Sequence, residues 1–328
     1  MTRDISVLSG GVGAARFLRG LINAVDDPTG ITAVVNTGDD CSVHGLSISP
    51  DIDTITYTLA GAIDPGRGWG LVDETWHAMG ALSRYESVRP QGSTAGERWF
   101  GLGDQDLATH FYRTARLGEG ASLTDVTNEI RTAWNVPIEI VPMTDDRLST
   151  IVTIREADSV LGPDTDRDVS FQEYFVRLKH QIPVSAIRFD GQAGLSAAAR
   201  AAILGAETIV VAPSNPLVSI GPIRSLDGVD ELLEQRRESV VAVSPIVGGA
   251  ALKGPADRML TELGHEPTVV GVARLYAPIA SALVVDTADA HLASAIEKLG
   301  MRCVVAPSVM LTPKLAQSLA LETLAAVQ

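Results

Sequence analysis

The sequence predicts an α/β protein with a Rossmann-like, mostly parallel β-sheet. Short runs rich in β-branched residues alternate along the chain with segments of helical periodicity, which is the pattern of repeated β–α units. The first of these runs, Ile5–Leu8, breaks into a glycine-rich turn and continues as a helix. The chain has 328 residues, of which 45% are hydrophobic, so it is long enough to bury a large core.

The expected strands are short and bounded by turn residues. They are Ile5–Leu8, Ile31–Asn36, Ile138–Val141, Thr150–Arg155, Val184–Phe189, Thr208–Ala212, Ser239–Val243, Thr268–Val272, Ala282–Asp286 and Arg302–Ala306.

Helices are expected where apolar residues recur at helical spacing. They are Ala14–Val25, Ile52–Ala62, Asp73–Leu82, Leu107–Arg116, Leu123–Trp134, Phe171–Lys179, Leu195–Leu204, Val229–Glu238, Asp257–Leu263, Ala290–Leu299 and Pro313–Ala326. The helix-dominated stretch at about 66–135 separates two strand-rich halves. We therefore expect a single domain over residues 1–328, with a helical insertion at about 66–135 that caps the ligand crevice.

The composition restricts the classes of partner. A formal charge of −14 argues against nucleic acid and anionic membranes, because both require a basic face. An acidic protein that handles a phosphorylated substrate usually needs a divalent cation, here expected to be Mg²⁺. Cys41 and Cys303 are too few for a disulfide framework. The sequence shows no signal-peptide core and no apolar run of membrane-spanning length, so the expected location is the cytoplasm.

The glycine-rich turn after the first strand reads SGGVGAARFLRGL from Ser9 to Leu21. Such a turn directs backbone N–H groups and the positive end of a helix dipole at an anion, which predicts a phosphate site. Gly11 and Gly13 fit part of the dinucleotide fingerprint, but Arg16 occupies the position of its third glycine, which argues against an NAD site. The alternative is that the glycines serve only close packing of helix and sheet, although that role gives no reason for an arginine in the first helical turn.

Four carboxylates fall within fifteen residues around the end of the second strand. They are Asp39, Asp40, Asp51 and Asp53. Open α/β sheets bind ligands at the carboxyl ends of their strands, and Mg²⁺ is held by carboxylates together with phosphate and water. The cluster therefore predicts a magnesium and substrate site. The alternative for Asp51 or Asp53 alone is capping of the helix that follows.

Further polar residues follow other expected elements. Asp106 could cap the helix that carries His110, and an isolated histidine on a helix is more often a packing residue than a catalyst. Ser122-x-x-Asp125 has the spacing of a helix start. Two loops after strands, at 213–222 and 244–255, carry small polar side chains suited to purine or phosphate contacts, and Lys253 adds a positive charge for a diphosphate.

Together these motifs resemble a known family. The segments SGGVGAARFLRGL, NTGDD, GLSISPDIDTITYTLAG, GDQDLATHFYRT, GASLTDVT, PMTDD, VVAPSNPLVSIGPI and AVSPIVGGAALKGPADRM occur in the order found in the 2-phospho-L-lactate transferase family of coenzyme F(420) biosynthesis. The resemblance runs from Ile5 to about Pro313. It implies transfer of a phosphorylated three-carbon acid from a guanosine diphosphate donor to a ribityl hydroxyl of the deazaflavin Fo, with release of GMP and with magnesium present.

The resemblance also implies roles for individual residues. Donor phosphates would be held by the first loop, and the guanosine end by the PSNP loop, with Lys253 as a looser assignment. These donor residues are Ser9, Gly10, Gly11, Gly13, Arg16, Ser214, Asn215 and Lys253. Catalysis is assigned to Asp51 and Asp53. Acceptor binding is assigned to Asp51, Asp53, Asp104 and His110, and the metal to Asp39, Asp40 and Asp53. The family further implies a homodimer, for which the alanine- and leucine-rich helix Pro313–Ala326 offers a packing face.

The motifs do not distinguish an enolpyruvyl donor from a lactyl donor. Of the 26 basic residues, 22 are Arg and only four are Lys, a bias that a high-GC genome produces and that indicates an actinobacterial source. Since actinobacterial members of the family are described as using the enolpyruvyl donor, that donor is the expected one, with the lactyl donor as the alternative. An NAD(P)-dependent oxidoreductase and a non-catalytic nucleotide-binding protein are more distant alternatives.

Overall fold

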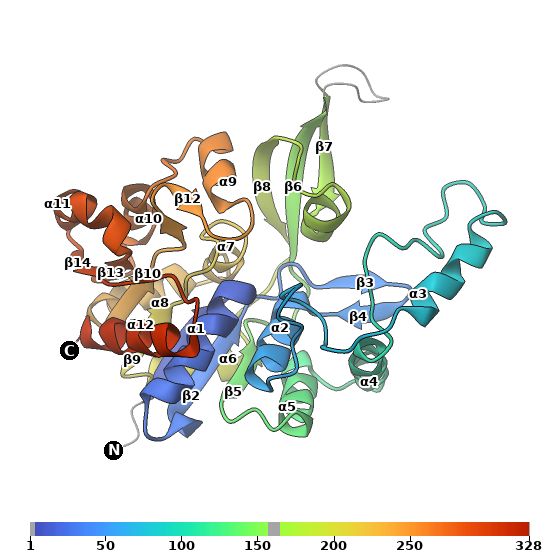
Figure 1. Ribbon diagram of the computed structural model, residues 1–328, viewed down its shortest axis with the longest axis horizontal. Coiled ribbons are helices and arrows are strands. Elements are labelled where there is room, and N and C mark those ends of the chain that lie inside the picture. The colour runs from blue at the N-terminus through green and yellow to red at the C-terminus, as the bar shows by residue number, and fades with distance from the viewer. Residues whose placement is uncertain (1–3, 157–164, 328) are drawn as a thin grey trace.

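A seven-stranded parallel sheet forms the centre of the computed structural model, which describes residues 4–156 and 165–327 (Figure 1). In order across the sheet, its strands are β14 (Arg302–Val305), β13 (Ala282–Val285), β10 (Val240–Val243), β9 (Thr208–Val211), β1 (Ile5–Ser9), β2 (Ile31–Val35) and β5 (Glu139–Pro142). From β1 the chain builds outward to β2 and β5 on one side, and later to β9 and the remaining strands on the other. The strand order therefore reverses between β1 and β9, which confirms the predicted fold class.

The strands are mostly apolar because helices cover both faces of the sheet. Within β10, Val240 and Ala242 belong to the core cluster of one face, whereas Val241 and Val243 belong to the cluster of the other. On the face of Val241 lie α1 (Val12–Ala24), α2 (Pro50–Leu59) and α12 (Pro313–Ala325). On the opposite face lie α6 (Ala197–Gly205), α7 (Ile220–Arg224), α8 (Val229–Gln235), α10 (Val269–Tyr276) and α11 (Ala293–Glu297).

The terminal helix α12 packs along α1 over a long interface. The close approach depends on Gly20 of α1, because a Cβ atom at this position would lie 2.4 Å from the backbone carbonyl of Ala316. Leu319 and Ala320 of α12 are buried in the same core cluster. One face of this helix is thus covered by α1 of the same chain, while its Leu321 is exposed; its packing against a second subunit stays a prediction.

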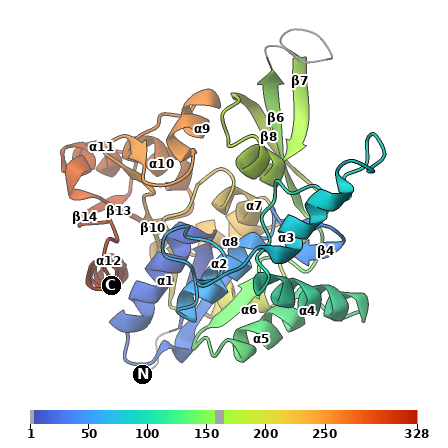
Figure 2. The ribbon, with the colours of Figure 1, turned by 45° about the vertical axis from the view of Figure 1, so that its right-hand side comes forward.

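A second, antiparallel sheet stands beside the main one. It consists of β7 (Thr165–Ser170), β6 (Ser149–Glu156) and β8 (Val184–Asp190), and it rises next to α9 (Ala256–Glu262) (Figures 1 and 2). The strands expected at 150–155 and 184–189 therefore exist, but they lie outside the parallel sheet. The sequence carries a signal for this arrangement, since polar and apolar residues alternate in β6 and β8 as in sheets with one solvated face.

Two other expectations differ from the structure. The strand expected at Thr268–Val272 is the first part of α10, whose first turn is capped by the Thr268 hydroxyl accepting from the Gly271 N–H. Residues 269–273 of this helix are all buried and apolar, and periodicity alone does not separate such a segment from a buried strand. The helix expected at Phe171–Lys179 is present over residues 171–177, but from Glu173 to Arg177 its hydrogen bonding is π-helical.

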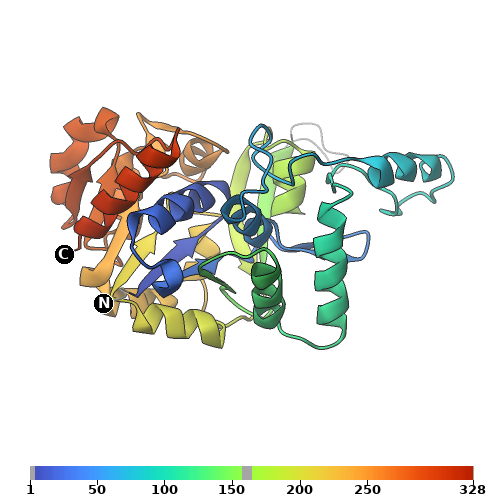
Figure 3. The same cartoon turned by 60° about the horizontal axis from the view of Figure 1, so that its bottom comes forward.

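The insertion contains α3 (His77–Leu82), α4 (Asp106–Gly118) and α5 (Leu123–Ala133), preceded by the hairpin of β3 (Cys41–Val43) and β4 (Leu46–Ile48). Ser122 and Asp125 form the predicted capping box of α5. Helix α3 projects away from the main sheet (Figures 1 and 3). The part of the insertion that reaches the strand ends is instead the loop around Gly68, which lies against Lys253.

Among the helices within residues 4–156 and 165–327, none combines the length and the apolar character needed to cross a membrane.

Replacing Gly20 by alanine tests the α1–α12 contact. Because the added methyl group meets backbone rather than a flexible side chain, we expect Gly20→Ala to lower the free energy of unfolding by about 1–3 kcal/mol. The control is Gly80→Ala in α3, where no atom lies within 4 Å of the new Cβ. That variant should keep or gain stability, since alanine is the better helix former. Urea denaturation measures both; equal stability of the two variants would contradict the tight contact.

Candidate active site at the carboxyl edge of the sheet

The candidate site lies where the strand order reverses. Here the N–H of Gly10, directly after β1, donates a 3.2 Å hydrogen bond to the Oγ of Ser214, which follows β9. The crevice outside such a reversal is the usual ligand position in open α/β sheets. The structure therefore brings the first glycine loop and the PSNP loop together, although about 200 residues separate them in the sequence.

The three glycines of the first loop touch other parts of the protein. A Cβ at Gly10 would lie 2.5 Å from the Cβ of Ser219, and one at Gly13 would lie 2.1 Å from the carbonyl oxygen of Pro213. A Cβ at Gly11 would lie 2.5 Å from Oδ1 of Asp51. The packing role that the sequence left open is thus confirmed for these positions. Phosphate binding by their N–H groups stays a prediction.

Two basic side chains meet at this edge. Arg16 lies on the first part of α1, and Lys253 follows β12 (Ala250–Ala251). Partial burial, and next the positive charge of Arg16, lower the pKa of Lys253. Within the described part of the chain neither side chain has an ion-pair partner, and no side chain caps the start of α1. Two uncompensated cations beside a free helix N-terminus form an environment for an anion.

A largely buried acidic cluster lies at the start of α1, where the Asp51 carboxylate approaches Gly11. Asn36 follows β2, and its Nδ2 donates to Oδ1 of Asp39 at 2.6 Å and to Oδ2 of Asp51 at 3.0 Å. Its own Oδ1 accepts from the Gly38 N–H. Asp40 accepts a 2.7 Å hydrogen bond from the Ser49 hydroxyl through Oδ2, while its buried Oδ1 has no hydrogen-bond partner.

Burial makes the charges of this cluster unfavourable. It raises the pKa of Asp51 to about 6, and it raises the pKa of Asp39, with the nearby charges of Asp51 and Asp40 adding to the effect. Burial also raises the pKa of Asp40 well above its usual range. The same carboxylates affect Cys41, since burial and then their negative charges raise the pKa of its thiol to about 12. The cluster therefore concentrates carboxyl groups whose ionised forms are unfavourable without a bound cation.

Asp53 has a different environment from Asp51. Both of its oxygens accept from the guanidinium of Arg113 on α4, one of them at 3.1 Å from Nη1, and both side chains are buried. Burial alone would lower the pKa of Arg113, but the charge and hydrogen bonds of Asp53 together with the charge of Asp40 outweigh it and raise that pKa. Asp53 is thus the partner of a buried arginine. The geometry favours Asp51 over Asp53 as the carboxylate that faces the crevice.

His110 is also part of this buried network. Its Nδ1 lies 3.8 Å from Oδ2 of Asp53, and its Nε2 lies 3.2 Å from Oδ2 of Asp106. The Tyr57 hydroxyl donates to Asp106 at 2.6 Å. The expectation that Asp106 caps α4 is wrong, because its side chain accepts from Tyr57 instead. The start of α4 is capped by Glu74, which accepts from the N–H groups of Gln105 and Asp106. With 1% of its surface exposed, His110 matches the packing alternative rather than direct contact with an acceptor.

Asp104, assigned to acceptor binding from the sequence, binds backbone within the insertion. It accepts from the Thr75 hydroxyl and from the N–H groups of His77 and Ala78, the first two residues of α3. These hydrogen bonds lower its pKa and stabilise the start of α3. The structure therefore gives Asp104 a helix-capping role.

The polar residues of the donor loops are likewise hydrogen-bonded within the chain. The Ser9 hydroxyl donates to the Val7 carbonyl, and Ser9 is fully buried. Oδ1 of Asn215 accepts from the N–H groups of Leu217 and Val218, which sets the turn of the PSNP loop. Their predicted contacts with the donor stay predictions.

Three functional candidates were missed by the sequence reasoning. Asn36 closes the acidic cluster, Arg113 neutralises Asp53, and Gln172 donates from its Nε2 to Oδ2 of Asp39 at 3.2 Å. Asn36 is the first polar residue after a buried strand, and this position could have identified it from the sequence. Arg113 and Gln172 reach the site from α4 and from the small sheet, and no local pattern marks them.

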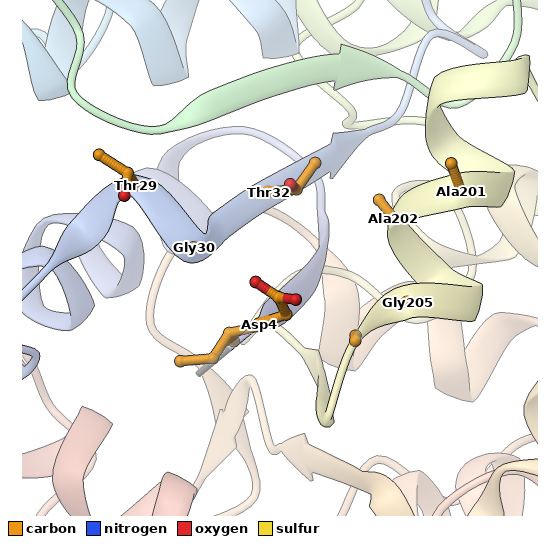
Figure 4. Close-up of a pocket in the computed structure, with 9 residues that line it drawn as sticks. Asp4, Thr29, Gly30, Thr32, Ala201, Ala202 and Gly205 are labelled. Atoms are coloured by element: carbon orange, nitrogen blue, oxygen red, sulfur yellow. The ribbon is translucent and has the colours of Figure 1, made fainter. Parts of the chain in front are cut away.

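A cavity at the opposite edge of the sheet does not belong to this site. It has a volume of about 170 Å³ and is lined by residues at the beginnings of β1 and β2, such as Asp4 and Thr32, and by α6 (Figure 4). It is smaller than the usual ligand pocket of roughly 300–1,000 Å³.

Comparison with known proteins identifies the family. The family described as 2-phospho-L-lactate transferase CofD matches residues 5–306. The chain belongs to this family. Phosphoenolpyruvate transferases from Kitasatospora aureofaciens and Streptomyces coelicolor are 41% and 40% identical to it, each over 93% of this chain and 92% of the relative. That of Mycobacterium tuberculosis is 38% identical over 94% of each. As a CofD-family member, the protein is a transferase of coenzyme F(420) biosynthesis, which confirms the predicted enzyme class.

A solved structure supports the fold of this CofD-family chain. A protein of the UPF0052 family from Bacillus halodurans aligns with a TM-score of 0.60, covering 98% of this chain and 100% of its own, at 15% sequence identity. At this identity the likeness concerns the fold alone.

The Asp53–Arg113 pair predicts an effect on stability. Removing one partner of a buried ion pair leaves the other charge uncompensated, so we expect Asp53→Asn to lower the free energy of unfolding by about 3–5 kcal/mol. Urea denaturation at pH 7 is the measurement. Wild-type stability of this variant would contradict the structural role of Asp53.

Asp51→Asn, two residues away, should have the opposite effect. The folded-state pKa of about 6 exceeds that of the unfolded chain, so the folded protein binds the proton more tightly and loses stability as the pH rises from about 4 to 6. The variant lacks this loss and should be more stable than wild type at pH 7 by about 1–3 kcal/mol, with the difference vanishing below pH 4. Denaturation curves across this range test the sign; a variant less stable than wild type at pH 7 would refute it.

Proposed function

We propose that the protein transfers a phosphoenolpyruvyl group from enolpyruvoyl-2-diphospho-5′-guanosine to 7,8-didemethyl-8-hydroxy-5-deazariboflavin (Fo), giving dehydro coenzyme F(420)-0 and GMP. The observation that carries the proposal is the pairing of two opposite charge clusters at one sheet edge. Arg16 and Lys253 supply uncompensated positive charge for a diphosphate, and Asp39 and Asp51 supply buried negative charge beside it. The family and its phosphoenolpyruvate transferases support the same chemistry.

The basic pair and the first loop would bind the donor. N–H groups at the start of α1 point toward the crevice end of the helix, and a guanidinium at Arg16 can meet two phosphate oxygens at once. Ser214, through its hydrogen bond to Gly10, keeps the PSNP loop beside this position. In this arrangement the guanosine would lie over the PSNP loop and the diphosphate between Arg16 and Lys253.

The acidic cluster fits Mg²⁺. Its donors are carboxylate oxygens, which this hard cation prefers, and Oδ1 of Asp40 is buried without a partner. No group of three or more acidic, histidine or cysteine side chains within the described ranges is arranged to hold a metal ion by itself. One or two carboxylates with diphosphate oxygens complete the usual magnesium site, and here Asp39 and Asp40 are the residues that would hold it. When bound, Mg²⁺ supplies the charge that neutralises the diphosphate of the donor.

Asp51 is placed to accept a proton. Its Oδ2 is held by Asn36 and its Oδ1 points at Gly11 of the first loop. The primary hydroxyl of the ribityl chain would attack the phosphorus that bears the enolpyruvyl group, forming the new P–O bond as the bond to the GMP phosphate breaks. The hydroxyl proton passes to the Asp51 carboxylate, and GMP leaves with the bonding electrons. The loop N–H groups and Arg16 stabilise the charge on the transferred phosphoryl group.

Two details of the proposal rest on the relatives and on composition. The enolpyruvyl donor is favoured because relatives about 40% identical are phosphoenolpyruvate transferases and because the basic residues are mostly Arg. The lactyl donor is the alternative within the same reaction. A homodimer in the cytoplasm, which the family resemblance implies, completes the proposal.

Turnover with each donor tests the function. We expect purified protein given Fo and Mg²⁺ to form product with a higher kcat/KM for the enolpyruvyl donor than for the lactyl donor. The two donors differ at the carbon that bears the phosphate oxygen, which is planar in one and tetrahedral in the other. In a pocket fitted to one of them, this difference changes the transition-state binding free energy by about 1–3 kcal/mol, so the expected ratio of kcat/KM values is roughly 10- to 200-fold. Mass spectrometry identifies dehydro coenzyme F(420)-0 by its two hydrogens fewer than the lactyl product.

Asp51→Asn is the matched negative control, because it should remove turnover without loss of stability. A preference for the lactyl donor would overturn the donor assignment. Absence of product with either donor would overturn the transferase reaction, and GDP binding without turnover would then favour a nucleotide-binding protein.

A further inference from the structure

One loop of the insertion approaches the proposed donor site. This loop, Asp64–Leu71, is here called the strap. It is closed on itself, because the Asp64 N–H donates to the Gly70 carbonyl at 3.1 Å and the Gly68 N–H donates to the Asp64 carbonyl at 2.8 Å. Residues Ile63 and Leu71 on either side form an isolated β-bridge.

Side chains make the strap rigid. Oδ1 of Asp64 accepts from the N–H groups of Gly66 and Arg67, and Oδ2 forms a 3.0 Å ion pair with Arg67. The Arg67 guanidinium also donates to the Leu71 carbonyl at 2.8 Å and lies 5.5 and 5.4 Å from the ring centroids of Trp69 and Trp76. The charge of Arg67 is thus compensated within the strap by Asp64.

Gly68 is the point at which the strap meets the crevice. It is buried and has a φ of +75°, a backbone conformation that favours glycine. A Cβ at this position would lie 2.8 Å from Nζ of Lys253. The amine of Lys253 therefore occupies the space that a side chain at position 68 would fill.

This contact has a consequence for binding. Lysine has a long flexible side chain, and fixing it when a ligand binds costs about 0.5–1.5 kcal/mol. Lys253 is exposed and is repelled by Arg16, so in the absence of a wall its amine would move away from the arginine. A wall at Gly68 would limit that movement and would keep the two cations close together before any anion arrives.

We propose that the strap is the outer wall of the diphosphate site and that Gly68 is a positioning residue, which holds the Lys253 amine beside Arg16 for the donor. The identity of the donor rests on the proposed function. Whichever donor the protein uses, the binding of a diphosphate between these two cations should depend on the absence of a side chain at position 68.

Binding of GDP and of inorganic pyrophosphate, both with Mg²⁺, tests the inference by calorimetry. Gly68→Ala should displace the Lys253 amine and weaken both ligands by about tenfold, equal to about 1.4 kcal/mol. The matched control is Gly70→Ala in the same strap. Gly70 has a φ of +66°, so alanine is strained there as well, but the nearest atom to its Cβ is Nη2 of Arg67 at 4.0 Å. This variant should bind both ligands within about twofold of wild type.

A double variant separates the contact from general damage to the strap. In a Lys253→Ala background, Gly68→Ala should cause no further loss of affinity, because the side chain it displaces is gone. Equal losses in Gly68→Ala and Gly70→Ala, or a loss at Gly68 that persists without Lys253, would overturn the inference. A loss for GDP alone would also overturn it, since the strap would then act on the nucleoside.

The two ligands distinguish this inference from the proposed function. Wild-type binding of pyrophosphate without binding of GDP would refute the guanosine donor, while the comparison at position 68 would still be made with pyrophosphate. Failure of wild type to bind either ligand would refute both.

Discussion

Burial of like charges at the carboxyl edge of the sheet is the constraint on which the site depends. Asp39 and Asp51 come from different elements and are held by the two hydrogens of one amide, that of Asn36. Removing carboxylates from water beside one another is unfavourable, which is why the pKa values of both are raised. The protein therefore keeps an unfavourable arrangement that a bound cation would relieve. Such local instability is common where binding requires preorganised charge.

Helix α2 carries two carboxylates with different surroundings, one at the proposed site and one in a buried ion pair. Asp51 and Asp53 are two residues apart, and positions i and i+2 point to opposite sides of a helix. Asp51 consequently faces Gly11 and the crevice, while Asp53 faces Arg113 of α4. The buried pair joins the helical insertion to the parallel-sheet domain, and it adds a cation behind the acidic cluster that favours the ionised form of Asp40.

Glycines at this edge serve contacts between segments that are distant in sequence. Gly13 lets α1 begin against the Pro213 carbonyl, and Gly11 leaves room for the Asp51 carboxylate. Gly68 does the same for the Lys253 amine. In each case the missing side chain lets a polar group of another loop approach the backbone, so the loops that would surround the donor are held by direct contact.

Local patterns in the sequence determined the strands of the parallel sheet, the glycine turn, the capping box at Ser122 and the acidic residues of the site. These depend on neighbours within a few residues, through periodicity, turn chemistry and capping. The ordered motifs also determined the family. Local patterns failed at Thr268–Val272, because a fully buried helix and a buried strand are equally apolar. They also failed for β6 and β8, whose sheet depends on pairing partners along the chain.

Only the tertiary structure decided the role of each polar residue at this edge of the sheet. Asp51 and Asp53 are equivalent by sequence, and the position of Arg113, 60 residues further on, makes one structural and leaves the other facing the crevice. Asp104 and His110 are drawn into a helix cap and a buried network by partners that no spacing rule reveals. The physical reason is common to all of them. Hydrogen bonds and charge compensation are set by three-dimensional proximity, whereas the sequence pattern reports only the secondary structure and the burial of each segment.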